Sequence, residues 1–460
     1  MTRMWSPGVA LLLLCGGLVT LWCASTAAPG SMLDLEAVYY GSRCLLQHHD
    51  PYQESEFLHI FEEERGETPT VANGLLLVHA GVVKCINLPT ALFLLTPLAI
   101  LPWGLAHTVW MVLTVSSLTL ASVLIWTSVA NRRSGLVLFL TCFLLLNSKV
   151  LISDGNLSGM AVALCVIGSF CILEERLWPA GIVCLAVSLT LKPHISGGVW
   201  LFFLLAGGTF RKRALQTLAL TIVLCVPAIA WTWQVAPQWL QELNSNLSTS
   251  ASRYHINDPG PYAAAGNNQL SIIDLQTVTS VFGDNPRVYN TAAYIVCGPL
   301  LLVWAIVTLR SRPSLTQAYL GIAAIAALSM LPFYHRMYDA KVLLLTIPAC
   351  NMLVARGGLT GRLALLSTAA GFVITGDIPL EFLTVLTKDA HISITSFSGK
   401  VLTVLVNRPV PLLLLMLSVF YLWVYVQSAR KTDGTRYKAI HGTAKGIPTN
   451  GMPFVAEHNT

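Results

Sequence analysis

Apolar runs without a charged residue, separated by short polar segments, occupy most of the chain. Two of them, Leu136–Leu146 and Pro411–Val426, show the pattern clearly. The runs are continuous rather than alternating, which indicates helices and not membrane strands. Roughly 20 apolar residues in a helix cross the ~30 Å hydrocarbon core of a bilayer. The pattern therefore predicts an all-α integral membrane protein.

Twelve of the apolar segments are expected to be transmembrane helices. A further apolar segment, residues 88–102, is short and contains three prolines, so we expect an interfacial or re-entrant helix there. The expected spans are 8–28, 104–129, 135–152, 156–173, 178–191, 193–209, 214–233, 290–309, 315–333, 339–355, 362–377 and 409–427.

The charged residues between these spans are divided unevenly. If the spans alternate in direction, one side of the membrane receives 16 of the 28 Lys+Arg but only 4 of the 22 Asp+Glu. Excess Lys and Arg in short loops marks the cytoplasmic side, so both termini are expected in the cytoplasm. Counting 88–102 as a span would place 131–133, with its two arginines, outside and break this alternation. The long loops 29–103, 234–289 and 378–408 then face outward.

Composition supports a membrane domain followed by a polar tail. The chain is 54% hydrophobic and 11% charged, whereas soluble proteins carry about 25% charged residues. We expect residues 1–430 to form one polytopic domain and residues 431–460 to be a disordered cytoplasmic tail. Arg3, an apolar stretch and the small residues 24–28 resemble a signal peptide, but we favour an uncleaved first helix because many spans follow.

The eleven cysteines do not form a recognisable framework. Most lie inside apolar runs, where cysteine behaves as a small hydrophobic residue, and their spacing contains no zinc motif. Cys44 and Cys85 could pair in the first outer loop, and two free thiols are the alternative. We expect no cofactor, although a carboxylate beside a phosphate can recruit a divalent metal.

Ionisable residues in or beside spans are costly and suggest function. Five such places lie on the predicted outer side, and the first begins just after the first helix. Asp34 at the membrane surface could act as a general base toward a hydroxyl group. The alternative is structural, because Ser31 or Asp34 could be the N-cap of the apolar helix that contains Tyr39 and Tyr40.

The second and third places permit two readings each. His48–Asp50 could bind a metal, but adjacent residues seldom converge on one ion, and the following proline favours a turn. Asp154 and Asn156 could hydrogen-bond a sugar, and a plain tight turn explains them equally well. Asn156 and Asn246 also each begin an Asn-Leu-Ser triplet, a weak match to the N-glycosylation pattern.

The fourth and fifth places carry cations. Lys192 precedes a proline between two short apolar segments, where its ammonium suits a phosphate, and snorkelling to the interface is the alternative. His335, Arg336, Asp339 and Lys341 lie within seven residues of one another. Arg336 and Lys341 could hold a phosphate or pyrophosphate, and a simple ion pair between Arg336 and Asp339 is the structural alternative.

Together these groups suit a sugar that is activated by phosphate. Cations stabilise the departing phosphate without an acid catalyst, a carboxylate accepts the proton of the attacking hydroxyl, and aromatic side chains pack on sugar faces. Attack opposite the phosphate would invert the anomeric centre.

Six stretches match, in order, the motifs of a known family. They are Asp34, Tyr39-Tyr40, Leu45-Leu46 and Asp50-Pro51-Tyr52; Leu88-Pro89-Thr90-Ala91 with Pro97 to Pro102; Asp154-Gly155-Asn156; Ala180-Gly181 to Lys192-Pro193; Gly266 to Ser271; and Tyr334 to Asp339. In these stretches the sequence resembles glycosyltransferase family 87 (DUF2029) of the GT-C superfamily, which contains polyprenyl-phosphate-mannose-dependent α-mannosyltransferases. The resemblance extends from the first to about the tenth span. The chain has Asp154 where the family has Gln, and Asn87-Leu88-Pro89 where it has Tyr-Pro-Pro, which leaves the sugar open.

The resemblance implies a GT-C-type bundle with interfacial helices in the first outer loop. It implies that Asp34 is the catalytic base. The donor phosphate is expected to bind Lys192, Arg336 and His335, with Lys341 beside them. The sugar or acceptor is expected to contact Asn268 and Gln269, together with Tyr39, Tyr40, Asp154, Asn156 and Asp339.

The sequence thus predicts an inverting glycosyltransferase that moves a hexose, expected to be mannose, from a polyprenyl-phosphate donor to a lipid or glycan acceptor outside the cytoplasm. Its expected partners are these substrates and membrane lipids, and no nucleic acid. A transferase using another polyprenyl-phosphate sugar, such as arabinofuranose, remains open. So does a lipid or glycan transporter, although the chain shows no repeated half. A catalytically inactive scaffold is disfavoured by the intact Asp34, Lys192 and Arg336.

Overall fold

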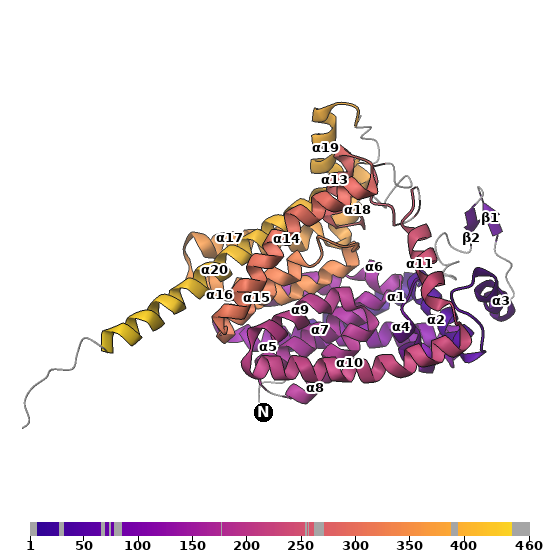
Figure 1. Cartoon of the computed structure of the whole chain (residues 1–460), viewed down its shortest axis with the longest axis horizontal. Helices are drawn as coiled ribbons and strands as arrows, with labels where there is room; N and C mark the ends of the chain where they lie inside the picture. Colours follow the sequence, from indigo (N-terminus) through magenta and orange to yellow (C-terminus); the bar gives the residue numbers. More distant parts are fainter. Residues whose placement is uncertain are drawn as a thin grey trace, which may run out of the picture.

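The protein is almost entirely helical in the part that the structure, a computed structural model, describes (Figure 1). The described residues are 7–26, 32–65, 70–72, 75–77, 85–175, 177–253, 255, 257–261, 271–387 and 394–443. Within them the strands β1 (Thr70–Ala72) and β2 (Leu75–Leu77) form one short antiparallel hairpin. The predicted all-α class is confirmed.

Six helical segments of the described chain are long and apolar enough to cross a membrane, and a bent pair can supply a seventh. They lie in α1 (Pro7–Thr26), α5 (Trp103–Leu146), α10 (Gly208–Val235), α14 (Pro286–Ser311), η1 with α16 (Met337–Thr346 and Ile347–Arg356) and α20 (Pro409–Thr443); the bent pair is α17 (Gly358–Ile374) with α18 (Asp377–Thr387). These helices confirm an integral membrane protein, while the count of twelve spans stays a prediction.

Shorter helices occupy the remaining predicted spans and the outer loops. The apolar ones are α4 (Pro89–Ala99), α7 (Leu157–Leu173), α8 (Trp178–Leu191), α9 (Pro193–Ala206), α15 (Leu315–Leu328) and α19 (Phe397–Asn407). The others are α2 (Leu33–Leu46), α3 (Glu54–Arg65), α6 (Lys149–Ser153), α11 (Trp239–Ser250) and α13 (Leu275–Phe282). Helix α4 confirms a helix within residues 88–102 that is too short to span a bilayer, at about 16 Å.

Helix α5 replaces two predicted spans, and its geometry requires a sharp bend. A straight helix would hold Trp110 and Asn147 about 55 Å apart at 1.5 Å per residue. The indole Nε1 of Trp110 donates to the carbonyl oxygen of Gly155 at 2.9 Å, and the eight residues from Asn147 to Gly155 reach at most about 29 Å. The two ends of α5 therefore lie near each other. The sequence predicted that the helix is interrupted between spans 104–129 and 135–152, and this is wrong because α5 is continuous. The chain does reverse direction within α5.

Tyr39 and Tyr40 belong to an aromatic cluster between α2, α3 and the start of α5. Both side chains are buried, and each packs against the ring of Trp103. Tyr40 also contacts Phe61 on α3, and the hydroxyl of Tyr39 donates to the carbonyl of Leu101 at 2.8 Å. This cluster joins α2 to α3 and to the start of α5.

Arg408 connects the start of α20 to α13 and the loop before it. Its guanidinium is buried before α20 and donates to the carbonyls of Pro259 and Gly260 at 2.9 and 2.8 Å, and also to Thr277 on α13. Burial lowers the pKa of Arg408 to about 10, and the carboxylate of Asp274 opposes this shift.

The remaining expectations concern the tail and the thiols. Helix α20 continues to Thr443, into the tail that was expected to be disordered, and 444–460 lie outside the described residues. All eleven cysteines are free. Cys44 and Cys85 are both buried, so the structure favours the free-thiol alternative over a disulfide between them.

Glycines permit the closest contacts between neighbouring helices. A Cβ on Gly361 of α17 would lie 2.6 Å from the backbone oxygen of Leu353 on α16. The turn between these helices uses Gly357 and Gly358, both with positive φ, which favours glycine. The backbone at Gly361 therefore has no room for a side chain.

We predict that Gly361→Ala destabilises the protein by about 1–3 kcal/mol, because a backbone atom must move to admit the methyl group. The measurement is thermal unfolding in detergent followed by tryptophan fluorescence. The matched control is Gly298→Ala on α14, where a Cβ meets nothing within 4 Å. Equal melting temperatures for the two variants would contradict this account of the contact.

Candidate functional site

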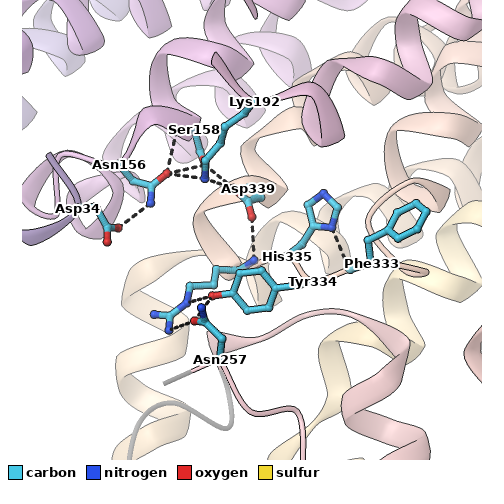
Figure 2. A network of polar contacts seen from close by, with 10 residues as sticks. Asp34, Asn156, Ser158, Lys192, Asn257, Phe333, Tyr334, His335 and Asp339 are labelled. Carbon is cyan, nitrogen blue, oxygen red and sulfur yellow. Dashed lines mark hydrogen bonds and ion pairs between the residues drawn. The ribbon is translucent and has the colours of Figure 1, made fainter. Parts of the chain in front are cut away.

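Four separate chain segments bring their polar side chains together at one end of the bundle (Figure 2). They are the start of α2, the turn between α6 and α7, the junction of α8 with α9, and the segment between α15 and η1. Each is a helix terminus, where unpaired backbone groups and polar side chains are normally found.

Asp34 lies in the first turn of α2, and the α6–α7 turn holds that helix terminus. The amide of Met32 donates to the carbonyl of Ser153 at 2.8 Å, and the amide of Asp34 donates to the carbonyl of Asp154 at 2.9 Å. Gly155 has a φ of +64°, and a Cβ there would lie 2.7 Å from that of Leu35. The α6–α7 turn therefore needs glycine in order to approach α2.

The side chain of Asp34 is not the helix cap. The N-cap of α2 is Met32, with left-handed backbone and no side-chain cap bond, and Ser31 lies outside the described residues. The half-buried carboxylate of Asp34 instead accepts a hydrogen bond from Nδ2 of Asn156 at 2.6 Å. The capping alternative for Asp34 is wrong.

Asn156 links Asp34 to the half-buried ammonium group of Lys192. As the N-cap of α7, its Oδ1 accepts from the amide of Ser158 at 2.8 Å, and it also accepts from Nζ of Lys192 at 2.9 Å. Two donors at Oδ1 fix the orientation of the amide, so Nδ2 must face Asp34. The Asn-Leu-Ser triplet acts here as a helix cap, and both Asn156 and Asn246 are buried.

Lys192 lies where one helix ends and the next begins, which confirms the predicted opening at the Lys-Pro step. Its ammonium donates to Ser158 Oγ at 2.6 Å and lies 3.7 Å from Oδ1 of Asp339. It also lies 5.4 Å from the ring centre of Tyr338, within cation–π range. The side chain points into the protein, so the snorkelling alternative is wrong.

The start of η1 and the residue before it supply the other charged groups. The carboxylate of Asp339 accepts from the backbone N–H of Arg336 at 2.8 Å and contacts the hydroxyl of Ser158. The guanidinium of Arg336 donates to the Asn257 side-chain oxygen at 3.1 Å and to the hydroxyl of Tyr334. Arg336 thus links the loop that contains Asn257 to the site.

His335 adds an imidazole beside these cations. Its Nδ1 lies 3.0 Å from the carbonyl of Phe333, and its ring packs edge-on against His194 at 5.0 Å. Burial lowers the pKa of His335, and Lys192 contributes to the lowering while Asp339 opposes it. The ring is therefore neutral at pH 7.

Asp154 places a second carboxyl group near Asp34. Burial raises its pKa to about 7, and the charge of Asp34 adds to the rise while that of Arg336 opposes it. Near neutral pH this carboxyl group is partly protonated, so its charge changes within the physiological range.

Some predicted site residues lie elsewhere. Lys341 is buried, and its ammonium donates to the carbonyls of Asn147 and Thr375 rather than facing the site. The expectation that it binds phosphate is not supported. Tyr39 and Tyr40 pack in the aromatic cluster described above, away from a sugar-binding role. Asn268 and Gln269 lie outside the described residues.

The polar residues His48–Asp50 lie in the connection between α2 and α3. Asp50 accepts from the amide of Tyr52 at 2.8 Å, and His49 Nδ1 lies 3.3 Å from a carboxylate oxygen of Glu56. Across the described residues, no group of three or more His, Cys, Asp or Glu side chains is arranged to hold a metal ion.

Sequence reasoning missed Ser158 and Asn257. Ser158 was read only as part of a glycosylation triplet, although Asn-x-Ser also fits an N-cap with a hydroxyl in the first turn. Asn257 is far from Arg336 in sequence and lies in a loop without a motif, so only the fold places it.

Comparison with known proteins identifies one family. The model of "Glycosyltransferase family 87" matches residues 86–332, more than half of the chain. No curated protein and no solved structure gives a significant match. The matched range includes Asp154, Asn156 and Lys192, and it excludes Asp34 and Arg336.

We predict that Asp154 makes stability depend on pH. Its pKa in the folded protein is about 7, above the ordinary value of 3.8 for an exposed aspartate. Ionisation therefore costs folded-state stability, and this cost grows as the pH rises from about 4 to about 7. The melting temperature of Asp154→Asn relative to wild type should be higher at pH 8 than at pH 5.

The control is Glu63→Gln, which removes an exposed carboxylate on α3 and should show no such trend. An equal difference between Asp154→Asn and wild type at both pH values would contradict the assignment.

Proposed function

The chain belongs to glycosyltransferase family 87, and we propose that it moves a hexose, mannose, from a polyprenyl-phosphate donor to a hydroxyl of a lipid or glycan on the extracytoplasmic face. The observation that carries this proposal is the chain of contacts from Asp34 through Asn156 to Lys192. It joins a carboxylate suited to a general base with an ammonium suited to a phosphate.

The phosphate end of the proposed site is formed by Lys192 and Arg336. The ammonium of Lys192 has one side chain of opposite charge nearby, Asp339 at 3.7 Å, so it can accept a further anion. The guanidinium of Arg336 contacts neutral oxygens of Asn257 and Tyr334, which a phosphate can replace with a stronger charge-assisted bond.

The reaction itself needs one base. The acceptor hydroxyl oxygen attacks the anomeric carbon while the bond from that carbon to the phosphate oxygen breaks. Asp34 takes the hydroxyl proton, and the phosphate leaves with the bonding electron pair, stabilised by Lys192 and Arg336. Asn156 holds Oδ2 of Asp34, so Oδ1 is the oxygen proposed to receive the proton. Attack opposite the phosphate inverts the configuration.

The direction of the helices supports the extracytoplasmic side. Helix α9 starts at the site and is followed by Arg211–Arg213, while η1 and α16 start at the site and end at Arg356. Helix α15 runs the other way, from Arg312 toward the site. The cations of these connections thus lie at the opposite end, and such cations mark the cytoplasm. We extend the proposal to a GT-C arrangement of twelve spans with both termini in the cytoplasm.

We predict that Asp34→Asn abolishes transfer, because an amide cannot take the hydroxyl proton. Loss of a general base typically costs about 10²–10⁴-fold in kcat. The measurement is transfer of radiolabelled mannose from a short-chain polyprenyl-phosphate-mannose to a membrane lipid extract by purified enzyme in detergent. Glu63→Gln is the matched control.

A wild-type rate from Asp34→Asn would eliminate this residue as the base. No transfer by wild-type enzyme, with transfer from a polyprenyl-phosphate pentose instead, would correct the sugar. Movement of the intact lipid across a vesicle membrane without chemical transfer would favour the transporter alternative.

We predict that Lys192→Ala and Arg336→Ala each raise the KM for the donor by about 10-fold or more, since a hydrogen bond to a charged group contributes about 1.5–3 kcal/mol. The KM for the acceptor should change little. Competition by a polyprenyl phosphate that lacks the sugar provides the direct measurement of phosphate binding. Unchanged competition in both variants would remove their phosphate roles.

A further inference from the structure

A second buried ammonium group lies outside the proposed site. The Lys341 side chain is 1% exposed, and its Nζ donates to the carbonyls of Asn147 and of Thr375, the latter at 3.1 Å. Oδ1 of Asp377 lies 3.5 Å from the same Nζ. We name Lys341, Asp377 and Asn147 the Lys341 clamp.

The Lys341 clamp joins three parts of the chain. Lys341 is on η1, Asp377 is the first residue of α18, and Asn147 lies between α5 and α6. Oδ2 of Asp377 accepts from the amide of Val150 at 2.8 Å, and Oδ1 of Asn147 accepts from the amide of Ile378 at 3.1 Å. Each of the two segments, residues 147–150 at the start of α6 and the start of α18, therefore donates one backbone N–H to a side chain of the other.

Two of these parts carry the groups of the proposed site. On η1, Asp339 precedes Lys341 by two residues and contacts Lys192 and Ser158. Helix α6 leads directly into Ser153 and Asp154, whose carbonyls hold the first turn of α2. A displacement between η1 and α6 would therefore change the position of the base relative to that of Lys192.

The conformation of η1 makes contacts with other parts of the chain important for its stability. All ten residues of η1 form a buried 3₁₀ helix, whereas such helices rarely exceed three or four residues because their hydrogen bonds have poorer geometry. An ammonium removed from water keeps its partners, since losing them leaves a charge buried without compensation. Lys341 can thus fix the position of a helix whose own hydrogen bonds are weak.

We propose that Lys341 and Asp377 are positioning residues for the transfer reaction, which set the distance between Asp34 and Lys192. This inference rests on the proposed function. It predicts a specific kinetic defect: a misplacement of about 1 Å costs up to about 10²-fold in rate, while binding of the donor phosphate depends on groups local to Lys192 and Arg336. Weakening the clamp should lower kcat and leave the KM for the donor nearly unchanged.

The test compares Lys341→Met, Asp377→Asn and the double variant. Each single change leaves one partner unmatched, and Lys341→Met in particular leaves a carboxylate buried alone, so loss of folded protein is expected. The double variant removes both charges and should recover the thermal stability of wild type. It still lacks the ammonium that holds two carbonyls, so its kcat should stay at least about 10-fold below wild type with the donor KM within about 3-fold.

The matched control is Lys149→Met, a lysine on α6 whose ammonium lies over the ring of Trp22 at 4.7 Å. It should keep wild-type kcat. A double variant in which kcat returns together with stability would overturn the proposal, because the clamp would then be purely structural. If the double variant does not accumulate, Asp377→Asn decides, and wild-type kcat in that variant overturns the proposal.

Hydrogen–deuterium exchange gives a readout that does not need the reaction. In the double variant, peptides that cover 32–36 and 337–341 should exchange faster than in wild type, whereas peptides from α14 should not change. Unchanged exchange in both site peptides would overturn the proposal. If wild-type enzyme transfers no sugar from any donor tested, the proposed function fails, and the exchange data still decide whether the clamp holds the two segments.

Discussion

A lysine ammonium group held where helices end is the constraint on which the site depends. The Lys192 side chain is only 18% exposed, and withdrawing a lysine from water is costly unless charge and hydrogen bonds compensate. At Lys192 the compensation comes from Asn156, Ser158 and Asp339. Meeting this requirement brings α7, the α8–α9 junction and η1 together, and Asn156 extends the same network to Asp34 on α2.

Helices α8, α9 and α15 are shorter than the hydrocarbon core of a bilayer. They have 14 residues each, or about 21 Å, whereas the core is ~30 Å thick. If their far ends reach the interface, their near ends lie several Å inside it. Polar groups at that depth suit a substrate whose phosphate is attached to a lipid, because the lipid holds the phosphate close to the head-group region.

Hydrophobic pattern predicted the helices well because burial in lipid requires continuous apolar runs. It also predicted that Asp34, Lys192 and Arg336 belong together, since charge beside such runs is costly. The pattern failed where position depends on partners distant in sequence. Lys341 resembled Arg336 in its surroundings along the chain, and only the approach of Asp377 shows that its charge is matched elsewhere.

The same limit explains the two tyrosines. Tyr39 and Tyr40 follow the candidate base by five and six residues, and sequence reasoning assigned them a sugar-binding role. A helix places residues five and six positions apart on different faces, and the face that holds these rings is turned toward Trp103. Spacing along α2 alone distinguishes faces, but it does not show which face meets the site.

The two lysines, Lys192 at the α8–α9 junction and Lys341 on η1, thus have different proposed roles. Lys192 has partners with room for another anion, while Lys341 has two carbonyls and a carboxylate in a place with 1% exposure. Replacing a buried ion pair with apolar residues often leaves stability unchanged or improves it, so stability alone does not account for the Lys341 clamp. Fixing one geometry of η1, which hydrogen bonds within a 3₁₀ helix hold only weakly, does account for it.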